Sequence, residues 1–126
     1  MPRRILLVED NEDNRIIYRL TLAHFGYEVD EAGDGVSGIQ LATDTLPDLI
    51  LMDVSIPGID GWEATRRLKA DERTQHIPVV ALTGHALAGA SEGAKKAGCD
   101  SFVTKPCLPD DLVVEVRRML NLVKQG

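Results

Sequence analysis

The 126-residue chain contains little cysteine, no excess of basic charge and no long apolar run. Its two cysteines, Cys99 and Cys107, lack C-x-x-C spacing and neighbouring ligand residues, so we expect two reduced thiols rather than a disulfide or zinc site. No apolar stretch approaches the roughly 20 residues that cross a bilayer, and the start of the chain lacks the features of a signal peptide. We therefore expect a cytoplasmic protein with no membrane partner.

Acidic residues outnumber basic ones, 20 against 14, which gives a net charge of -6 and a pI near 5.0. This balance disfavours direct binding to nucleic acid and indicates protein partners instead. Hydrophobic residues make up 44% and charged residues 27%, as in ordinary globular proteins. A chain of this length is expected to form one domain over residues 1–126.

Five short apolar runs alternate with segments whose apolar residues recur every three or four positions, which is typical of alternating strands and helices. The runs end near positions 8, 31, 53, 82 and 104. Three of them, 5–8, 49–52 and 79–82, are continuously apolar, as expected for parallel strands covered by helices on both faces. The sequence therefore predicts an α/β fold with a central parallel sheet.

The intervening segments differ in how clearly they predict a helix. Asn11 and Asp13 can cap the first helix, whose apolar residues share one face: Ile16, Ile17, Leu20 and Ala23. The last segment has the cleanest apolar stripe: Leu112, Val116, Met119, Leu120 and Val123. The fourth is interrupted by glycines, each costing roughly 1 kcal/mol inside a helix, so we expect this helix to be the least firmly held.

Polar side chains follow four of the predicted strands at the point where each strand ends. Glu9 and Asp10 follow the first strand, Asp53 closes the third, Thr83 follows the fourth and Lys105 follows the fifth. A strand can simply end in Asp, because Asp often starts a turn. However, the carboxyl ends of parallel strands meet at one edge of the sheet, where ligands bind. We therefore expect these five side chains to converge.

The chemistry of this cluster predicts a phosphoryl site. Two carboxylates ~4 Å apart repel by about 4 kcal/mol at an effective dielectric near 20, so Glu9, Asp10 and Asp53 require a cation among them. Oxygen ligands without nearby Cys or His favour Mg²⁺, with Mn²⁺ as an alternative. Lys105 supplies an ammonium and Thr83 a hydroxyl for phosphoryl oxygens, which leaves Asp53 as the candidate nucleophile.

The combined motifs resemble the receiver domain of bacterial two-component response regulators, the CheY-like family. The residues that carry the resemblance are Val8-Glu9-Asp10-Asn11, Met52-Asp53 with Pro57 and Gly61, Thr83, and Phe102 with Lys105-Pro106. The resemblance covers essentially the whole chain. It implies a doubly wound, flavodoxin-like (βα)5 fold with five parallel strands in the order 2-1-3-4-5.

The resemblance also implies the phosphorylation chemistry. Asp53 would accept a phosphoryl group from a phosphohistidine on a histidine kinase or phosphotransfer protein. Mg²⁺ would be held by Asp10, Asp53 and the backbone carbonyl of Ser55, and Glu9 would assist through a metal-bound water. Lys105 would neutralise charge on the phosphoryl oxygens. The protein would thus be a signalling receiver that catalyses only its own phosphorylation and dephosphorylation, rather than an enzyme.

The resemblance further implies a conformational switch and a set of tuning residues. Thr83 would move toward the phosphoryl group and vacate space for the Phe102 ring, which changes the protein-binding surface of the fourth helix, fifth strand and fifth helix. The Lys105-Pro106 bond is expected to be cis. Ser55 and His85 lie two residues beyond Asp53 and Thr83 and would tune the phosphoryl lifetime, although His85 can equally be a solvent-facing loop residue.

Besides a signalling receiver, two other classes of function stay open, a constitutive adaptor and a hydrolase. We expect a stand-alone receiver, a monomer or weak dimer, that signals to a downstream protein target, because no helix-turn-helix or enzymatic output segment is present. The alternative is a constitutive adaptor in which the acidic cluster is not used. A hydrolase with an aspartyl phosphate intermediate is disfavoured, because Val54-Ser55 provides no second acid just beyond Asp53.

Overall fold

The computed structural model describes residues 3–84, 88–105 and 108–125, in which strands and helices alternate along the chain. The strands are β1 (Arg4–Val8), β2 (Glu28–Ala32), β3 (Leu49–Asp53), β4 (Val79–Thr83) and β5 (Ser101–Thr104). The helices are α1 (Glu12–His24), α2 (Gly35–Thr45), α3 (Gly61–Ala70), α4 (Ala88–Ala97) and α5 (Pro109–Gln125). The predicted strand ends at 8, 53 and 104 are confirmed, and those of β2 and β4 lie one residue further on.

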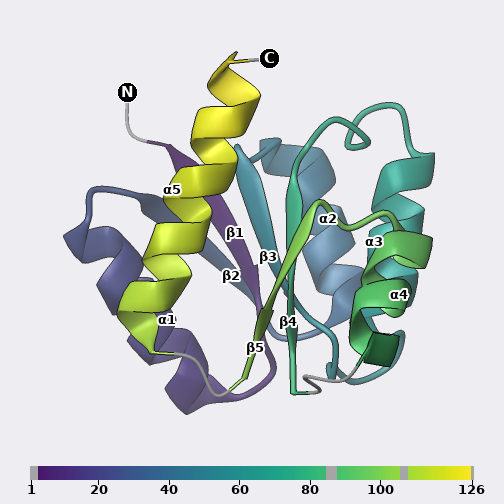
Figure 1. Ribbon diagram of the computed structural model, residues 1–126, viewed down its shortest axis with the longest axis horizontal. Helices are drawn as coiled ribbons and strands as arrows, with labels where there is room; N and C mark the ends of the chain where they lie inside the picture. Colours follow the sequence, from purple (N-terminus) through teal and green to yellow (C-terminus); the bar gives the residue numbers. More distant parts are fainter. Residues whose placement is uncertain (1–2, 85–87, 106–107, 126) are drawn as a thin grey trace.

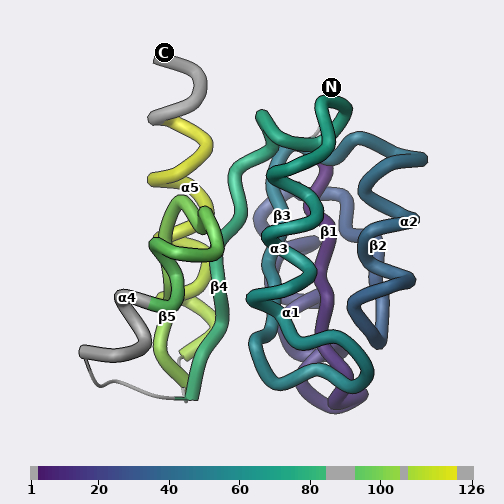
Figure 2. Tube along the Cα trace, turned by 90° about the vertical axis from the view of Figure 1, so that its right-hand side faces the viewer, coloured from purple at the N-terminus to yellow at the C-terminus, as the bar shows by residue number. Residues whose placement is uncertain are grey.

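The five strands form one parallel sheet in the order β2-β1-β3-β4-β5, which confirms the predicted α/β architecture (Figure 1). Helices α1 and α5 cover one face of this sheet, and α2, α3 and α4 cover the other; Figure 2 shows α3 and α4 from the side. All strands run in the same direction, so their carboxyl ends lie together along the lower edge of the sheet in Figure 1.

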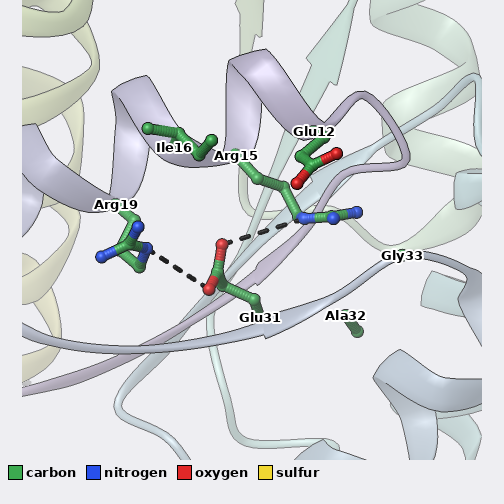
Figure 3. A pocket seen from close by; sticks show the side chains of 7 residues that line it. All are labelled: Glu12, Arg15, Ile16, Arg19, Glu31, Ala32 and Gly33. Atoms are coloured by element: carbon green, nitrogen blue, oxygen red, sulfur yellow. Dashed lines mark ion pairs between the residues drawn. The ribbon is translucent and has the colours of Figure 1, made fainter.

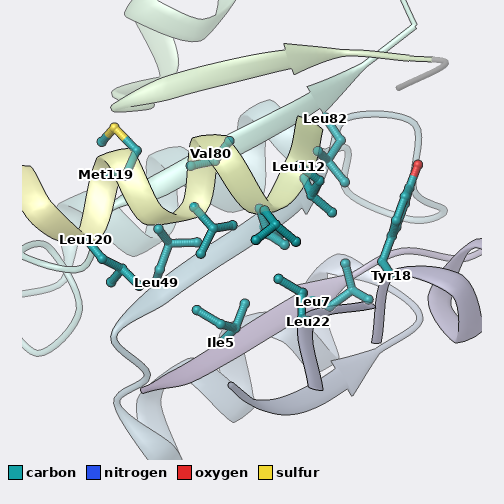
Figure 4. Close-up of a cluster of buried hydrophobic side chains, with 13 residues drawn as sticks. Ile5, Leu7, Tyr18, Leu22, Leu49, Val80, Leu82, Leu112, Met119 and Leu120 are labelled. Carbon is teal, nitrogen blue, oxygen red and sulfur yellow. The ribbon is translucent and has the colours of Figure 1, made fainter. Parts of the chain in front are cut away.

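The continuous apolar runs supply a core on each side of the sheet. In β1, Ile5 and Leu7 pack in the cluster under α1 and α5 (Figure 4), whereas Leu6 and Val8 pack in the cluster under α2 and α3. All four side chains are completely buried. The α5 stripe joins the first cluster through Leu112, Val116, Met119 and Leu120, and the side chain of Val123 lies outside the described part.

Helix α1 packs through residues other than those that the spacing grouped together. It buries Tyr18 and Leu22, which are one turn apart and contribute to the core under α5. The predicted apolar face is instead turned to solvent, with exposed fractions of 38%, 47% and 55% for Ile16, Ile17 and Leu20. Large apolar side chains grouped on an exposed surface are a common feature of interaction sites.

Three helices start at side-chain caps on the carboxyl side of the sheet. The carboxylates of Asp34 and Asp60 accept hydrogen bonds from the backbone amides of Ser37 and Glu63, both at 2.8 Å. Asn11 caps α1 in the same way, as predicted, whereas Asp13 lies in the first turn. Each cap satisfies an amide that the helix leaves unpaired, which fixes where the loops next to the sheet edge end.

Helix α4 forms over Ala88–Ala97 although Gly93 interrupts it. A Cβ atom at Gly93 would lie 3.2 Å from the ring of Trp62, so glycine permits close packing between α3 and α4. That this helix is the least firmly held stays a prediction. Within residues 3–84, 88–105 and 108–125, no helix has both the length and the apolar composition needed to cross a bilayer.

Candidate phosphoacceptor site

Strand register brings the predicted side chains to one edge. Val8 pairs with Met52 and Asp53 pairs with Leu82. Glu9 therefore follows β1 beside Asp53 at the end of β3, and Thr83 ends the neighbouring β4. Glu9, Asp53 and Thr83 are 1%, 3% and 1% exposed, which is unusual for two carboxylic acids.

Lys105 connects this edge to β5. Its Nζ donates hydrogen bonds to Glu9 Oε2 at 2.7 Å and to Asp53 Oδ2 at 2.8 Å. Its backbone amide donates to the carbonyl oxygen of Thr83 at 2.6 Å. Charge-assisted bonds of this kind are stronger than neutral ones, so a single ammonium joins three segments that are far apart in sequence.

Asp53 is held from its side chain and from its backbone. Its Oδ1 accepts a hydrogen bond from the Ser55 amide at 2.9 Å, while Oδ2 is bound by Lys105. On the backbone side, a Cβ atom at Gly61 would lie only 2.4 Å from the Asp53 carbonyl oxygen. Glycine at the start of α3 is therefore required by close packing, a role that its place in the family motif did not reveal.

The cluster carries more negative charge than Lys105 can neutralise. One oxygen each from Glu9, Asp10 and Asp53 lies within 4.8 Å of the others, and Asp10 is exposed at the opening. Counted by formal charge, three carboxylates and one ammonium leave two negative charges uncompensated. Hard oxygen donors with this excess charge fit a divalent cation such as Mg²⁺.

The pKa shifts reflect the same crowding. Burial raises the pKa of Glu9, and the neighbouring Asp53 raises it further, although the hydrogen bond from Lys105 opposes both effects. For Lys105, burial alone would lower the pKa, but hydrogen bonds to Asp53 and Glu9 outweigh this effect and the pKa is raised. Lys105 is therefore charged at neutral pH, whereas the ionisation of Glu9 is costly without another cation.

The remaining predicted residues occupy different environments. Ser55 is exposed beside Asp53, and Phe102 lies on the edge strand β5 with 37% of its area exposed. His85, the Lys105-Pro106 bond and Cys107 lie outside the described residues. The predicted roles of all these residues in switching, tuning and metal binding stay predictions.

Sequence reasoning did not find Arg15. Its Nη1 donates a hydrogen bond to the backbone carbonyl of Glu9 at 3.0 Å, so it contacts the loop that carries the acidic pair. An Arg in the first turns of a helix is usually a solvated residue, and nothing local in the sequence distinguishes it. The contact becomes apparent only in the fold, where the Arg15 side chain of α1 lies against the loop that carries Glu9 and Asp10.

Comparison with known proteins agrees with the fold. Residues 5–117 match the model of the response regulator receiver domain. The chain therefore belongs to the response regulator receiver domain family, the signalling domains of two-component systems.

Individual relatives place the chain within this family. It is 36% identical over 124 residues to the polar-differentiation response regulator DivK of Brucella anthropi, covering 98% of this chain and 95% of DivK. It is also similar to the chemotaxis response regulator CheY4 of Vibrio cholerae, with 26% identity, a TM-score of 0.89 and 94% and 98% coverage.

A third similar structure is the receiver domain of the sensor histidine kinase PA1611 from Pseudomonas aeruginosa. It is 35% identical to this chain, with a TM-score of 0.88, and the alignment covers 96% of this chain and 99% of that one. That structure was solved with a magnesium ion coordinated in its active-site cleft.

Proposed function

We propose that this chain is a phosphoacceptor response regulator that receives a phosphoryl group on Asp53 in two-component or phosphorelay signalling. The observation that carries this proposal is the Asp53 carboxylate, which is 3% exposed, bonded to Lys105 and surrounded by Glu9 and Asp10. A structural ion pair would need only one acid. The donor is a phosphohistidine on a histidine kinase or phosphotransfer protein, in keeping with family membership.

The acidic cluster is the proposed metal site. Asp10, Asp53 and the backbone carbonyl of Ser55 would hold Mg²⁺, or Mn²⁺ in its place, with Glu9 acting through a bound water. When bound, the ion supplies positive charge for the phosphoryl oxygens. The similar PA1611 domain supports this choice, because its structure contains a magnesium ion coordinated in its active-site cleft.

In the transfer step, a carboxylate oxygen of Asp53 forms a bond to phosphorus while the phosphorus–nitrogen bond of the donor breaks. The departing imidazole nitrogen keeps the electron pair and takes up a proton from solvent. Lys105, already 2.8 Å from Asp53 Oδ2, stabilises charge on the phosphoryl oxygens, and Thr83 donates its hydroxyl to one of them. Most of the catalysis is therefore positioning and electrostatic stabilisation.

In dephosphorylation, a water molecule attacks phosphorus and gives up a proton while the bond to Asp53 breaks, which releases inorganic phosphate and restores the carboxylate. Ser55 is exposed beside Asp53 and can influence the approach of this water. The proposed tuning role of His85 concerns a residue outside the described part. The lifetime of the signal depends on these neighbours rather than on Asp53 alone.

The exposed apolar face of α1 supports a protein donor. Ile16, Ile17 and Leu20 are large, exposed and carried by the helix that begins two residues after Asp10. A partner that covers this face would place its own reactive group close to the acidic cluster. A small-molecule donor would have no use for such a surface.

The output is proposed to be a change of surface. Thr83 moves toward the phosphoryl group, and the ring of Phe102 turns inward into the space it leaves. A groove of about 450 Å³ lies between β5 and α5, lined by Phe102, Val103, Thr104, Asp111, Val114 and Glu115. Val114, 65% exposed, gives this groove an apolar rim for a downstream protein.

Incubation with Mg²⁺ and a small phosphodonor such as phosphoramidate tests the proposal. We expect a mass gain of one phosphoryl group, located on Asp53 by peptide mapping and absent when Mg²⁺ is chelated. Asp53→Asn should abolish it. An unmodified wild-type chain would refute the proposal, and a modified chain whose partner binding does not change would favour the constitutive adaptor.

A further inference from the structure

Arg15 links the acidic loop to the edge of the sheet. Its guanidinium donates from Nη1 to the Glu9 carbonyl at 3.0 Å, while Nε lies 3.8 Å from Glu31 Oε1 on β2 (Figure 3). A Cβ atom at Gly33 would lie 3.2 Å from Nη1, so the loop after β2 also closes against this group. Only 24% of the Arg15 side chain is exposed.

The bond to Glu9 acts on Asp10 through the peptide plane. The Glu9 carbonyl and the Asp10 amide belong to one planar unit, so fixing the carbonyl oxygen also fixes the direction in which the chain enters Asp10. Glu9 is already held by its amide, which donates to Ala32, and by its carboxylate, which accepts from Lys105 and from the Asn11 amide. Arg15 binds the backbone carbonyl, which is the hydrogen-bonding group of Glu9 that these contacts leave.

We propose that Arg15 is a positioning residue that orients the Glu9–Asp10 peptide and so directs the Asp10 carboxylate toward Asp53 for Mg²⁺ binding. This inference rests on the proposed function. Arg15 touches neither the proposed ion nor the phosphoryl group, and it acts through the backbone. Loss of a group that orients a metal ligand typically weakens metal binding by 10- to 100-fold.

Arg19 provides a matched control. It lies one turn further along α1 and pairs with the same partner, with Nε 3.3 Å from Glu31 Oε2, but no hydrogen bond to the acidic loop is found for it among the described residues. Both arginines line the same cavity of about 500 Å³. Arg15→Met and Arg19→Met each remove one positive charge near the site and one pairing with Glu31.

The direction in which the Mg²⁺ affinity changes distinguishes a positioning role of Arg15 from the effect of its charge alone. Removing a positive charge near a cation site should by itself tighten Mg²⁺ binding, in both variants. If Arg15 positions Asp10, Arg15→Met instead weakens Mg²⁺ binding by about tenfold, while Arg19→Met tightens it by no more than about twofold. Titration calorimetry with Mg²⁺ alone measures both constants.

A metal-free measurement provides a second readout. The amides of Asp10 and Asn11 should exchange hydrogen faster in Arg15→Met than in Arg19→Met, because only the first variant releases the loop. If Arg15→Met does not fold, Arg15→Lys keeps the charge but offers a single nitrogen in place of the separate Nη1 and Nε atoms that face Glu9 and Glu31, and a several-fold weaker Mg²⁺ affinity is expected.

Equal Mg²⁺ affinities in the Arg15 and Arg19 methionine variants, or wild-type affinity in Arg15→Lys where the methionine variant does not fold, would overturn the inference. A wild-type chain that binds no Mg²⁺ would instead refute the proposed function on which it rests. The two failures are therefore distinguishable in one set of titrations.

Discussion

Lys105 lies at the carboxyl ends of the strands, here the Lys105 edge, and Lys69 of α3 lies beside the amino ends of β4 and β5, here the Lys69 edge. The exposed fractions of the two side chains are 21% and 19%. Each ammonium binds acceptors from distant segments. Lys69 donates to the backbone carbonyls of Ile77 and Gln75 at 2.7 and 3.2 Å and to the Asp100 carboxylate at 2.9 Å. The similarity of the two lysines makes the difference between their partners informative.

At the Lys69 edge the charges balance. One ammonium faces one carboxylate, and Asp100 Oδ2 also accepts from the Val79 amide at 2.8 Å, so the cluster ties the starts of β4 and β5 together. At the Lys105 edge, two buried carboxylates bind the ammonium and Asp10 adds a third. The excess of acid distinguishes a site that needs a ligand from an ion pair that only joins segments.

The largest expected effect comes from Lys105→Met. Without Mg²⁺, the buried carboxylates of Glu9 and Asp53 lose their counter-ion, so the free energy of unfolding should fall by about 3 kcal/mol. Mg²⁺ at about 100 times its dissociation constant stabilises a folded state that binds it by ~2.7 kcal/mol. Because loss of the Lys105 charge also tightens Mg²⁺ binding, one and the same Mg²⁺ concentration should stabilise this variant more than wild type in urea unfolding. A metal-free variant as stable as wild type would contradict the proposed charge imbalance.

Lys69→Met tests the balanced cluster. It leaves two backbone carbonyls and the Asp100 carboxylate without their donor, which should cost about 2 kcal/mol of unfolding free energy. Mg²⁺ should stabilise this variant no more than it stabilises wild type. Lys95→Met, at an exposed position on α4, is the control and should change stability by less than about 0.5 kcal/mol. A Mg²⁺-dependent rescue of Lys69→Met would remove the distinction between the two edges.

Gly61→Ala tests how tightly the Lys105 edge is built. The new methyl group would lie 2.4 Å from the Asp53 carbonyl oxygen and 2.7 Å from the Val54 Cα atom, so the backbone must shift. We expect a loss of about 1–2 kcal/mol and slower phosphorylation of Asp53.

Gly84→Ala is the matched substitution for Gly61→Ala, because a Cβ atom there meets nothing within 4 Å. Urea unfolding and the phosphoryl mass gain measure both variants. Equal effects of the two substitutions would mean that the contact between Gly61 and Asp53 is unimportant.

The fold and the edge cluster follow from features that are local in the sequence. Continuous apolar runs specify buried parallel strands, and the polar residue after each run, such as Glu9 or Lys105, must then lie at the common edge. The strand order came from the family resemblance, because spacing alone does not determine which strands are neighbours. What the sequence predicted well were thus properties of single segments and of sheet chirality.

The contacts that surround the cluster could not be predicted in the same way. Which side of α1 packs depends on the rotation of the helix, and the side with Tyr18 and Leu22 joins the core rather than the side with more apolar residues. The contact of Arg15 with Glu9 and the close approach of Gly61 to Asp53 join separate segments. Such contacts are decided by packing, for which one sequence carries no local signal.

The smallest expected effect concerns Cys99, which is next to Asp100 at the Lys69 edge. Burial raises the pKa of this thiol; a hydrogen bond with Thr65 Oγ1 and the Lys69 charge oppose this, whereas Asp100 adds to it. The pKa of Cys99 is higher in the folded state than in the unfolded one. Its contribution to the free energy of unfolding is therefore fully present below the unfolded pKa and is lost as pH rises through the folded pKa. Near pH 8.5, where a free cysteine is about half thiolate, folded protein should therefore be alkylated more slowly than protein unfolded in urea.

A Cys107→Ser chain isolates this reaction at Cys99, and mass spectrometry follows its rate. Mg²⁺ should leave the rate unchanged, because within the described part of the chain Lys69 pairs with a single carboxylate, that of Asp100, and the pair has no excess negative charge to attract a cation. Equal rates in folded and unfolded protein would show that burial does not control the thiol. A rate that responds to Mg²⁺ would show instead that the two edges are coupled through the sheet, and the contrast between a closed ion pair and an open acidic site would then no longer hold.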